Sequence, residues 1–462
     1  MRRFTVRIDS KPIAIDRTEK RMHRRKFTRG GLVATAVILT VAIFTGCAAT
    51  GDASGEEVAT GSFDWKRFDG EEIRFVAGLQ PWQAAVEPLI PQFEQKTGIK
   101  VNMESLPEDQ FRQRLQVELT AGSDDIDVFM SSVQQDGARF AQSGWYEDLK
   151  PYIENKSLTA PDYDFGDFSE SVVNGHTFDG VLSALPIQLE VQMLYYRKDL
   201  LAKAGFDAPP ATLDELREMA AAMTDPADGV YGWAARGKSA AAVTQLTSFL
   251  LNYGATYMNE DGTAAFDSKK GIAAIEEYGS LIRDYGPSGN TNNSWEELLA
   301  LFQAGSLALW ADNSGQAVAV RDAASSKYAD QVGFAPMPAG PAGDAQTFFG
   351  WAAGISSSSA HKDASWLFLQ WLTSPDVVGQ LQDQGIAGGR QSVPFGKDVN
   401  PEFVTAFQSA LSKAQPQLPQ VKSVPEVRDA IGAAIVTSIQ GGDVAAATKK
   451  AAEAFDQIVS TE

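Results

Sequence analysis

The strongest constraint on the fold of this chain is a regular alternation of strand and helix patterns that begins at Glu71. The stretch "EIRFVAG" predicts a strand ending at Gly78, and "QAAVEPLIPQFEQKTG" predicts a helix that stops at Gly98. The segments "IKVNMESL", "EDQFRQRLQVELTAG" and "DIDVFMSS" continue as strand, helix and buried strand. Because alternation of this kind favours parallel pairing, it predicts an α/β fold with a mostly parallel sheet.

Later segments keep the same character. In "PPATLDELREMAAAMT", Thr212 with Glu215 three residues on predicts a capped helix, and residues 239–303 are mainly helical in pattern. The segments "SLALWADNSG" and "WAAGISS" predict strands, and "KDASWLFLQWLTSP" predicts an amphipathic helix. A chain of 462 residues with this pattern is long enough for two or three domains.

The N-terminal segment predicts an export signal followed by a lipid attachment site. The basic stretch "RMHRRKFTRG" precedes an uncharged run, Leu32 to Phe44, which is too short to span a bilayer. Cys47, the only cysteine, follows Thr45 and Gly46 and resembles the lipidated cysteine of bacterial lipoproteins. We therefore predict a signal peptide at 1–46 and a flexible tether at 47–69; a retained transmembrane anchor is the alternative.

Composition and motifs exclude several functions. A net charge of −19 repels nucleic acid and anionic lipid headgroups. The three histidines form no zinc motif, and the chain carries neither a nucleophile elbow nor a phosphate-binding loop, so we expect no metal and no cofactor. Two alternatives remain open: a carboxylate pair that hydrolyses glycosides, and a ferric-iron site at Tyr195-Tyr196. Strand alternation places these two tyrosines on opposite faces, which argues against their binding one ion.

Tryptophan is the positive signal. Four tryptophans fall at predicted strand ends and loops, where indole rings can stack on the apolar faces of sugars or polyols while polar neighbours pair with the hydroxyls: Trp82, Trp233, Trp310 and Trp351. The alternative for each is an ordinary place in the hydrophobic core. Trp366 and Trp371 fit that alternative, because they share a predicted helix with Leu367 and Leu372.

An ordered series of segments resembles the extracellular solute-binding proteins of family 1, the carbohydrate receptors of ATP-driven importers. These segments include "FEQKTGIKV", "FAQSGWYEDLKPYI", "LPIQLEVQMLYYRKDLLAKAG" and "LFQAGSLALWADNSG", and the resemblance runs from about residue 70 to 460. Within the family, "YGWAARGKS" and "ALWADNSG" are most similar to receptors for sugar alcohols.

The resemblance implies a periplasmic-binding-protein-like fold of type II, with two lobes joined by a three-crossing hinge. It implies crossings near Gln188, Phe334 and Thr373. Residues 70–187 plus 337–372 would form lobe 1, and residues 188–336 plus 373–462 would form lobe 2. Ligand would lie in the cleft between the lobes and become buried on hinge closure.

The resemblance also implies a set of ligand-binding residues around the cleft: Gln80, Trp82, Gln135, Asp136, Gln188, Glu190, Trp233, Arg236, Trp310, Asp312, Trp351 and Arg390. Which of Gln134 to Asp136 faces the cleft is left open.

Together these features predict a monomeric receptor, not an enzyme, that is anchored outside the cytoplasm through Cys47. It would pass a sugar or sugar alcohol to the permease subunits of an ABC importer. The rival functions are a secreted lipoprotein glycosidase and an iron or oligopeptide receptor on the same fold.

Overall fold

The computed structural model describes residues 62–462, which belong to one compact unit spanning Val58–Glu462. The predicted signal peptide, residues 1–46, and the predicted lipidation site, Cys47, lie outside the described residues. Within 62–462, no helix combines the length and the apolar character needed to cross a membrane.

Residues 62–69 are part of the folded body. Phe63, Trp65 and Phe68 pack against the hydrophobic core, and the Lys96 amine lies 3.9 Å from the centre of a Trp65 ring. The predicted tether, residues 47–69, is therefore wrong for residues 62–69. Burial of three aromatic side chains stabilises the packing of this segment on the folded body.

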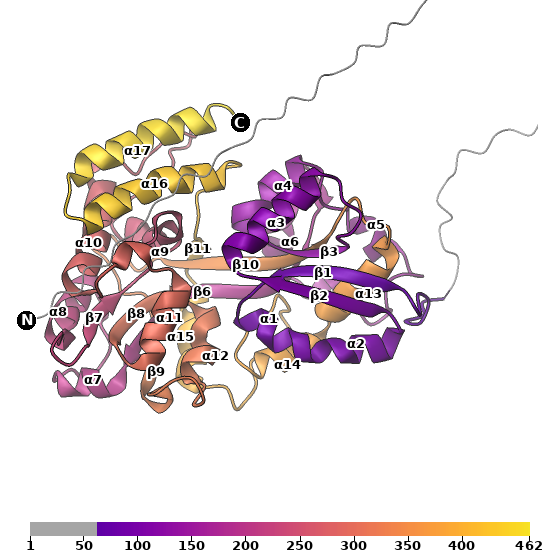
Figure 1. Cartoon of the computed structure of the whole chain (residues 1–462), viewed down its shortest axis with the longest axis horizontal. Coiled ribbons are helices and arrows are strands. Elements are labelled where there is room, and N and C mark those ends of the chain that lie inside the picture. The colour runs from indigo at the N-terminus through magenta and orange to yellow at the C-terminus, as the bar shows by residue number, and fades with distance from the viewer. Residues whose placement is uncertain (1–61) are drawn as a thin grey trace, which may run out of the picture. The chain divides into compact units, whose positions relative to one another are not determined.

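A nine-stranded sheet runs through the whole unit (Figure 1), with strand order β2-β1-β3-β10-β6-β8-β7 and with β11 and β9 pairing β10 and β6. The strands are β1 (Glu72–Gly78), β2 (Lys100–Leu106), β3 (Val128–Ser132), β6 (Leu185–Arg197), β7 (Tyr231–Ala234), β8 (Leu307–Asn313), β9 (Val332–Pro336), β10 (Gln346–Ile355) and β11 (Ala414–Pro416). Pairing is parallel in β2-β1-β3, in β7-β8 and between β10 and β11. It is antiparallel between β6 and β10, between β10 and β3, and where β6 meets β8 and β9. The predicted α/β class is confirmed.

Two long strands connect the two lobes. The first half of β6 pairs with β10, whereas its second half, from Gln192 on, pairs with β8 and β9. Strand β10 pairs with β6 through Phe348–Ala353 and with β3 through Trp351–Ile355. Figure 1 shows β6 and β10 running side by side between the two groups of helices. The crossing predicted near Gln188 falls on β6.

The pairings favour different positions for the other two crossings. Phe334 lies in β9, which pairs with the second half of β6 and so belongs to the second lobe. The chain is still in that lobe at Ala342, whose backbone N–H donates to the Asn252 carbonyl at 2.8 Å. The second crossing is therefore better placed on β10. Helix α14 (Pro375–Gln382) contacts the first lobe, where the Gln380 and Gln92 amides bond at 3.1 Å. We therefore propose that the third crossing follows α14 instead of lying at Thr373.

The first lobe covers its sheet with helices that match the sequence pattern. The predicted helix after β1 forms as α1 (Pro81–Val86), a short turn, and α2 (Ile90–Thr97), which ends at Gly98 in the left-handed conformation with φ of 79°. Helices α3 (Glu108–Thr120), α4 (Ala138–Gln142), α5 (Lys150–Glu154), α6 (Glu170–Gly175) and α13 (Lys362–Leu372) complete this lobe.

The second lobe is mainly helical around β7, β8 and β9. Its helices are α7 (Lys198–Lys203), α8 (Leu213–Met223), α9 (Ser239–Asn252), α10 (Lys269–Tyr285), α11 (Trp295–Ala304), α12 (Ala317–Arg321), α15 (Pro401–Leu411), α16 (Val424–Ile439) and α17 (Val444–Val459). The Thr212 hydroxyl accepts the Glu215 N–H at the start of α8, as its capping pattern predicts.

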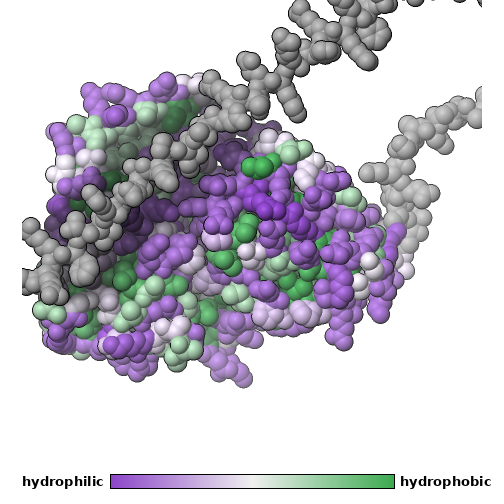
Figure 2. Space-filling view, in the orientation of Figure 1, coloured by the Kyte–Doolittle hydropathy of each residue, from purple (hydrophilic) through white to green (hydrophobic). Residues whose placement is uncertain are grey.

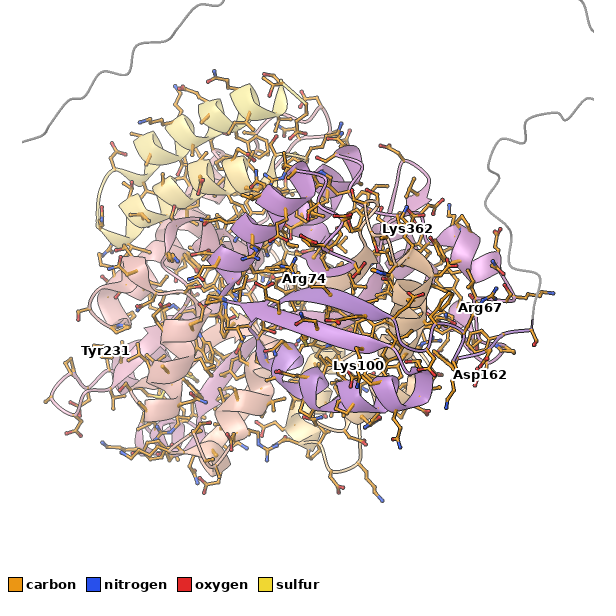
Figure 3. The ribbon with its side chains drawn as sticks, turned by 45° about the vertical axis from the view of Figure 1, so that its right-hand side comes forward. Arg67, Arg74, Lys100, Asp162, Tyr231 and Lys362 are labelled. Atoms are coloured by element: carbon orange, nitrogen blue, oxygen red, sulfur yellow. The ribbon has the colours of Figure 1, made fainter. Side chains whose placement is uncertain are left out.

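Ion pairs connect the outer strands β1 and β2 to helix α3. Arg74 of β1, labelled in Figure 3, forms ion pairs with Glu104 of β2 at 2.5 Å and with Glu118 of α3 at 2.9 Å. Hydrophilic residues cover much of the face in Figure 2, and the exposed large hydrophobic residues of the described chain are Leu79, Val117 and Leu411.

Replacing Trp310 with alanine should lower the free energy of unfolding by about 3–5 kcal/mol. The Trp310 ring is fully buried and stacks on Tyr195, with ring centres 5.0 Å apart. Chemical denaturation of the ligand-free protein measures this loss. A change below about 1 kcal/mol would show that the ring is not part of the core.

Candidate functional site

A polar cavity of about 40 Å³ lies between the two lobes, beside the crossing strands. Its lining combines first-lobe residues, two residues of β10 and one of β6, and second-lobe residues: Gly78, Leu79, Gln80, Glu108, Gln135, Glu190, Arg236, Thr244, Trp295, Asn313, Gln316, Phe349, Trp351 and Arg428. Both lobes are needed to complete it.

The lobes touch each other across the cleft. The Trp295 indole N–H of α11 donates to the Glu108 carboxylate of α3 at 3.3 Å, and Lys238 forms an ion pair with Asp109 at 3.1 Å. Both partners of the second pair are well exposed, so that pair adds little stability. This arrangement corresponds to a closed cleft.

The second-lobe wall is built around a buried ion pair. Arg236 Nε donates to Asp312 Oδ2 at 3.0 Å, and Arg236 Nη2 donates to Asp312 Oδ1. Asp312 is fully buried at the end of β8 and also accepts from the Gln245 amide at 3.4 Å. Burial alone would lower the pKa of Arg236, but the bidentate bond to Asp312 raises it above its ordinary value. Asp312 therefore fixes the guanidinium that faces the cavity.

Glu190 lies beside this pair on β6. Burial raises the pKa of Glu190 to about 7, Arg236 opposes that rise, and Asp312 adds to it. The Asn313 amide and the Gln188 amide approach its carboxylate at 3.5 and 3.3 Å. A Cβ on Gly315 would lie 1.9 Å from Glu190 Oε1, so the glycine of "ADNSG" is required to let this carboxylate sit there.

The first-lobe wall is organised by Arg112 of α3. Arg112 forms ion pairs with Asp136 and with Glu108, the latter at 3.1 Å, and its guanidinium carbon lies 5.4 Å from the centre of the Trp351 ring. Burial alone would raise the pKa of Glu108, but Arg112 and Arg236 hold it below its ordinary value. Arg112 thus holds both Glu108 and the indole face in place.

The charges around the cavity nearly cancel. Three arginines, Arg112, Arg236 and Arg428, stand against four carboxylates, Glu108, Asp136, Glu190 and Asp312. With Glu190 protonated, the balance is zero. Such a lining suits a neutral ligand with many hydroxyls, because amides, carboxylates and guanidinium groups can pair each of them.

Five of the residues expected from the sequence line the cavity: Gln80, Gln135, Glu190, Arg236 and Trp351. Two more lie directly behind the wall, where Asp136 binds Arg112 and Asp312 binds Arg236. Of the three candidates from Gln134 to Asp136, Gln135 lines the cavity, whereas Gln134 donates to the Phe348 carbonyl at 3.1 Å.

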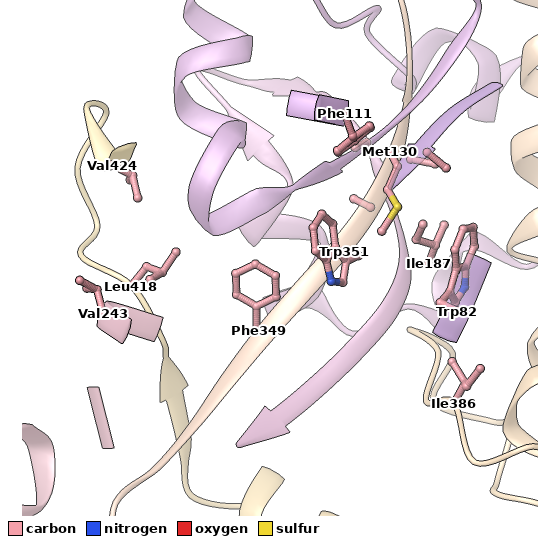
Figure 4. Close-up of a cluster of buried hydrophobic side chains, with 14 of the residues drawn as sticks. Trp82, Phe111, Met130, Ile187, Val243, Phe349, Trp351, Ile386, Leu418 and Val424 are labelled. Atoms are coloured by element: carbon pink, nitrogen blue, oxygen red, sulfur yellow. The ribbon is translucent and has the colours of Figure 1, made fainter. Parts of the chain in front are cut away.

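Three of the four tryptophans expected to stack on ligand are instead core residues. Trp82, Trp233 and Trp310 have no exposed surface; they pack against Phe75, Phe249 and Tyr195 respectively. Trp82 lies in α1, and the other two lie within strands β7 and β8. All three side chains are therefore buried inside a lobe and are not exposed at the cleft. Figure 4 shows Trp351 beside Phe349 on β10, with Trp82 close to Ile187.

Gln188 and Arg390 line a different cavity. This second cavity, of about 1250 Å³, has a largely apolar lining that includes Phe178, Phe348 and Phe407. Arg390 is buried against the rings of Tyr163 and Phe168 and donates to the Thr373 carbonyl at 2.8 Å. The role predicted for Arg390 in the cleft is therefore wrong in this structure, because backbone carbonyls and aromatic faces hold its guanidinium elsewhere.

The two adjacent tyrosines do not form an iron site. The Tyr195 hydroxyl donates to the Asn313 carbonyl at 2.7 Å, and the Tyr196 hydroxyl donates to Glu402 at 2.5 Å. They belong to different hydrophobic clusters on opposite faces of β6. Among residues 62–462, no group of three or more histidine, cysteine or acidic side chains is placed to hold a metal ion.

Sequence reasoning missed the cavity residues that helices supply, above all Glu108 and Arg428. The sequence does contain a signal for both residues, namely their helical spacing from buried apolar residues. Glu108 precedes Phe111 and Leu115 by three and seven residues, and Arg428 follows Val424 by four and precedes Ile431 by three. A charged residue at an apolar-stripe position marks a side chain that points inward.

The comparisons with known proteins agree with this geometry. Residues 77–379, well over half of the chain, match the bacterial extracellular solute-binding protein family. The chain belongs to this family. Its members are binding receptors and not enzymes, which removes the glycosidase alternative.

This solute-binding protein has relatives with assigned ligands. It is 27% identical over 458 residues to the erythritol/L-threitol-binding protein of Mycolicibacterium smegmatis, covering 92% of this chain and 94% of the relative. It is 32% identical over 336 residues to the mannitol-binding protein of Pseudomonas aeruginosa, covering 70% of this chain and 74% of the relative.

Solved structures show the same fold. An ABC transporter solute-binding protein from Agrobacterium vitis with bound D-mannitol superposes with a TM-score of 0.73 at 26% identity, covering 85% of this chain and 99% of the other. One from Thermotoga lettingae bound to α-D-tagatose gives 0.76 at 24% identity, covering 84% and 100%. The expected two-lobed periplasmic-binding-protein fold is thus confirmed.

Replacing Trp351 with alanine should weaken ligand binding about tenfold or more, because the indole lines the cavity and contributes stacking area. Isothermal titration with D-mannitol or erythritol measures the affinity. The loss of unfolding free energy without ligand should stay well below that of Trp310→Ala. Equal losses for the two variants would assign Trp351 to the core alone.

Replacing Glu190 with glutamine should remove a pH-dependent loss of stability. Because the folded-state pKa of about 7 exceeds the ordinary 4.5, the folded protein binds more protons than the unfolded chain between these values. The unfolding free energy therefore falls as pH rises through this window, by up to about 3 kcal/mol. Denaturation of both proteins from pH 4 to 8 isolates the effect. Parallel curves for the two proteins would contradict it.

Proposed function

We propose that this chain is the substrate-binding lipoprotein of an ABC importer, which captures a small neutral sugar alcohol in the interlobe cleft and delivers it to the permease. The observation that carries the proposal is the polar cavity between the lobes, where Arg112 and Arg236 are paired with carboxylates. A neutral polyol adds hydroxyls to such a lining without adding an unpaired charge.

The size of the cavity favours a small ligand. A volume of about 40 Å³ holds only a few water molecules, which leaves no room for an oligosaccharide in this arrangement of the lobes. The contacts of Trp295 and Lys238 with the first lobe bridge the cleft beside this cavity. These observations favour a single acyclic polyol or monosaccharide over an oligosaccharide.

The relatives support the same class. The two relatives described above are named for erythritol, L-threitol and mannitol, and the structure from Agrobacterium vitis holds D-mannitol. Lipid attachment at Cys47 and recognition of the closed form by permease subunits complete the proposal. Proteins of this family are extracellular, which is consistent with lipid anchoring and with recognition by a permease.

A ligand panel tests the proposal. We expect erythritol, ribitol or D-mannitol to raise the thermal stability of the purified protein, since ligand at 100 times its Kd adds about 2.7 kcal/mol. Maltose and D-gluconate are the controls for size and for charge, and titration calorimetry gives the affinities. Stabilisation by maltose or gluconate alone, with no effect of any polyol, would contradict the proposal.

A further inference from the structure

Arg428 reaches the cavity from a part of the chain that lies beyond the family match. That match ends at residue 379, whereas Arg428 belongs to α16 (Val424–Ile439). The residue is 6% exposed and lines the interlobe cavity. Helix α16 packs on α9, which also supplies the cavity residue Thr244.

The guanidinium of Arg428 is held firmly on one side. Its Nε donates to the Ala240 carbonyl at 3.1 Å, and its Nη2 donates to the Thr244 hydroxyl at 3.1 Å. Both acceptors belong to the second lobe and neither carries a charge. These two bonds use two of the five N–H groups of an arginine and fix the plane of the fork.

The remaining donors of Arg428 have no protein partner in the described part of the chain, where Arg428 forms no ion pair and its Nη1 makes no hydrogen bond. The other two arginines of the site differ, because Arg112 binds Glu108 and Asp136 while Arg236 binds Asp312. Burial and the nearby Arg112 lower the pKa of Arg428 to about 10, which still leaves it charged at neutral pH. The charges of Glu108 and Asp136 favour its charged form, but neither carboxylate bonds to it, so its remaining N–H groups are free to bind a ligand in the cavity.

We propose that Arg428 is a specificity-determining residue whose free N–H groups donate to hydroxyl oxygens of the bound polyol. This inference rests on the proposed function and names one contact that selects the ligand. Hydroxyl oxygens accept hydrogen bonds without bringing charge, which keeps the near-neutral balance of the cavity. A carboxylate ligand would instead add a negative charge beside Glu108 and Glu190.

The position of Arg428 also explains how recognition can depend on closure. Arg428 lies on the second lobe, and across the cavity lie Glu108 and Gln80 of the first lobe. A ligand that bonds to Arg428 on one side and to first-lobe groups on the other joins the two lobes. Ligands that lack the hydroxyl facing Arg428 would leave these donors unpaired and would bind more weakly.

Titration calorimetry on the full folded protein tests this contact. The probes are erythritol, ribitol, D-mannitol and D-gluconate, followed by monodeoxy analogues of the polyol that binds wild type most tightly. We expect Arg428→Met to weaken binding of that polyol about tenfold or more, because a charged hydrogen bond is lost. Arg428→Lys should give an intermediate loss. Arg217→Met is the matched control, since Arg217 pairs with Glu277 on the second lobe and lines neither cavity described here.

The deoxy analogues separate a ligand contact from a structural role. For wild type, removing the hydroxyl that faces Arg428 should weaken binding about fivefold or more, whereas in Arg428→Met the same removal should change affinity less than about twofold. Ligand-free melting of Arg428→Met should stay close to that of wild type, because methionine fills the site without a buried charge.

Each remaining result counts against the inference. Binding of the polyol by Arg428→Met within about twofold of wild type would overturn it while leaving the proposed function intact. If removing the ligand hydroxyl weakens binding equally in wild type and in Arg428→Met, the two losses are additive and Arg428 has only a structural role. Arg428→Lys is measured in the same series, so the test remains valid if Arg428→Met folds poorly. Loss of gluconate binding alone would make Arg428 a carboxylate site. If no polyol binds wild type, the proposed function fails and this inference fails with it.

Discussion

The pairing of β6 with β10 is the constraint on which the rest of the structure depends. These two strands run antiparallel through both lobes, so the same hydrogen bonds that hold the sheet together also join the lobes. Their register places Glu190 opposite Phe349 and Gln188 opposite Trp351, at the point where the strands pass beside the cavity. The acidic and aromatic parts of the site are therefore fixed by backbone pairing, not by loops.

A second constraint is the pairing of charge inside the cleft. Asp312 is fully buried and Arg236 nearly so, and each would be unfavourable alone; together they form a rigid bidentate unit. Arg112 performs the same role in the first lobe by holding Glu108 and Asp136. The two units let each lobe carry several charges into the cleft with little net charge left over.

Much of the fold could be predicted from the sequence, because burial on one side imposes a period near 3.6 on helices and alternation or apolar runs on strands. Phe111, Leu115 and Leu119 follow this rule in α3, as expected. The tryptophans could not be sorted in the same way. Trp310 and Trp351 both fall in strands, and only the partner that covers each strand face decides which ring meets the core and which meets the cavity.

The alternation of β10 carries one more consequence. Phe349 and Trp351 face the polar cavity, whereas Phe348 and Gly350 line the large apolar cavity on the other side of the same strand. A single-residue insertion or deletion within this strand would exchange the two sets, because side chains alternate along it. A length change in the loops around β10 would leave both sets in place. Point substitutions at alternate positions of β10, in contrast, change the lining of one cavity and leave that of the other intact.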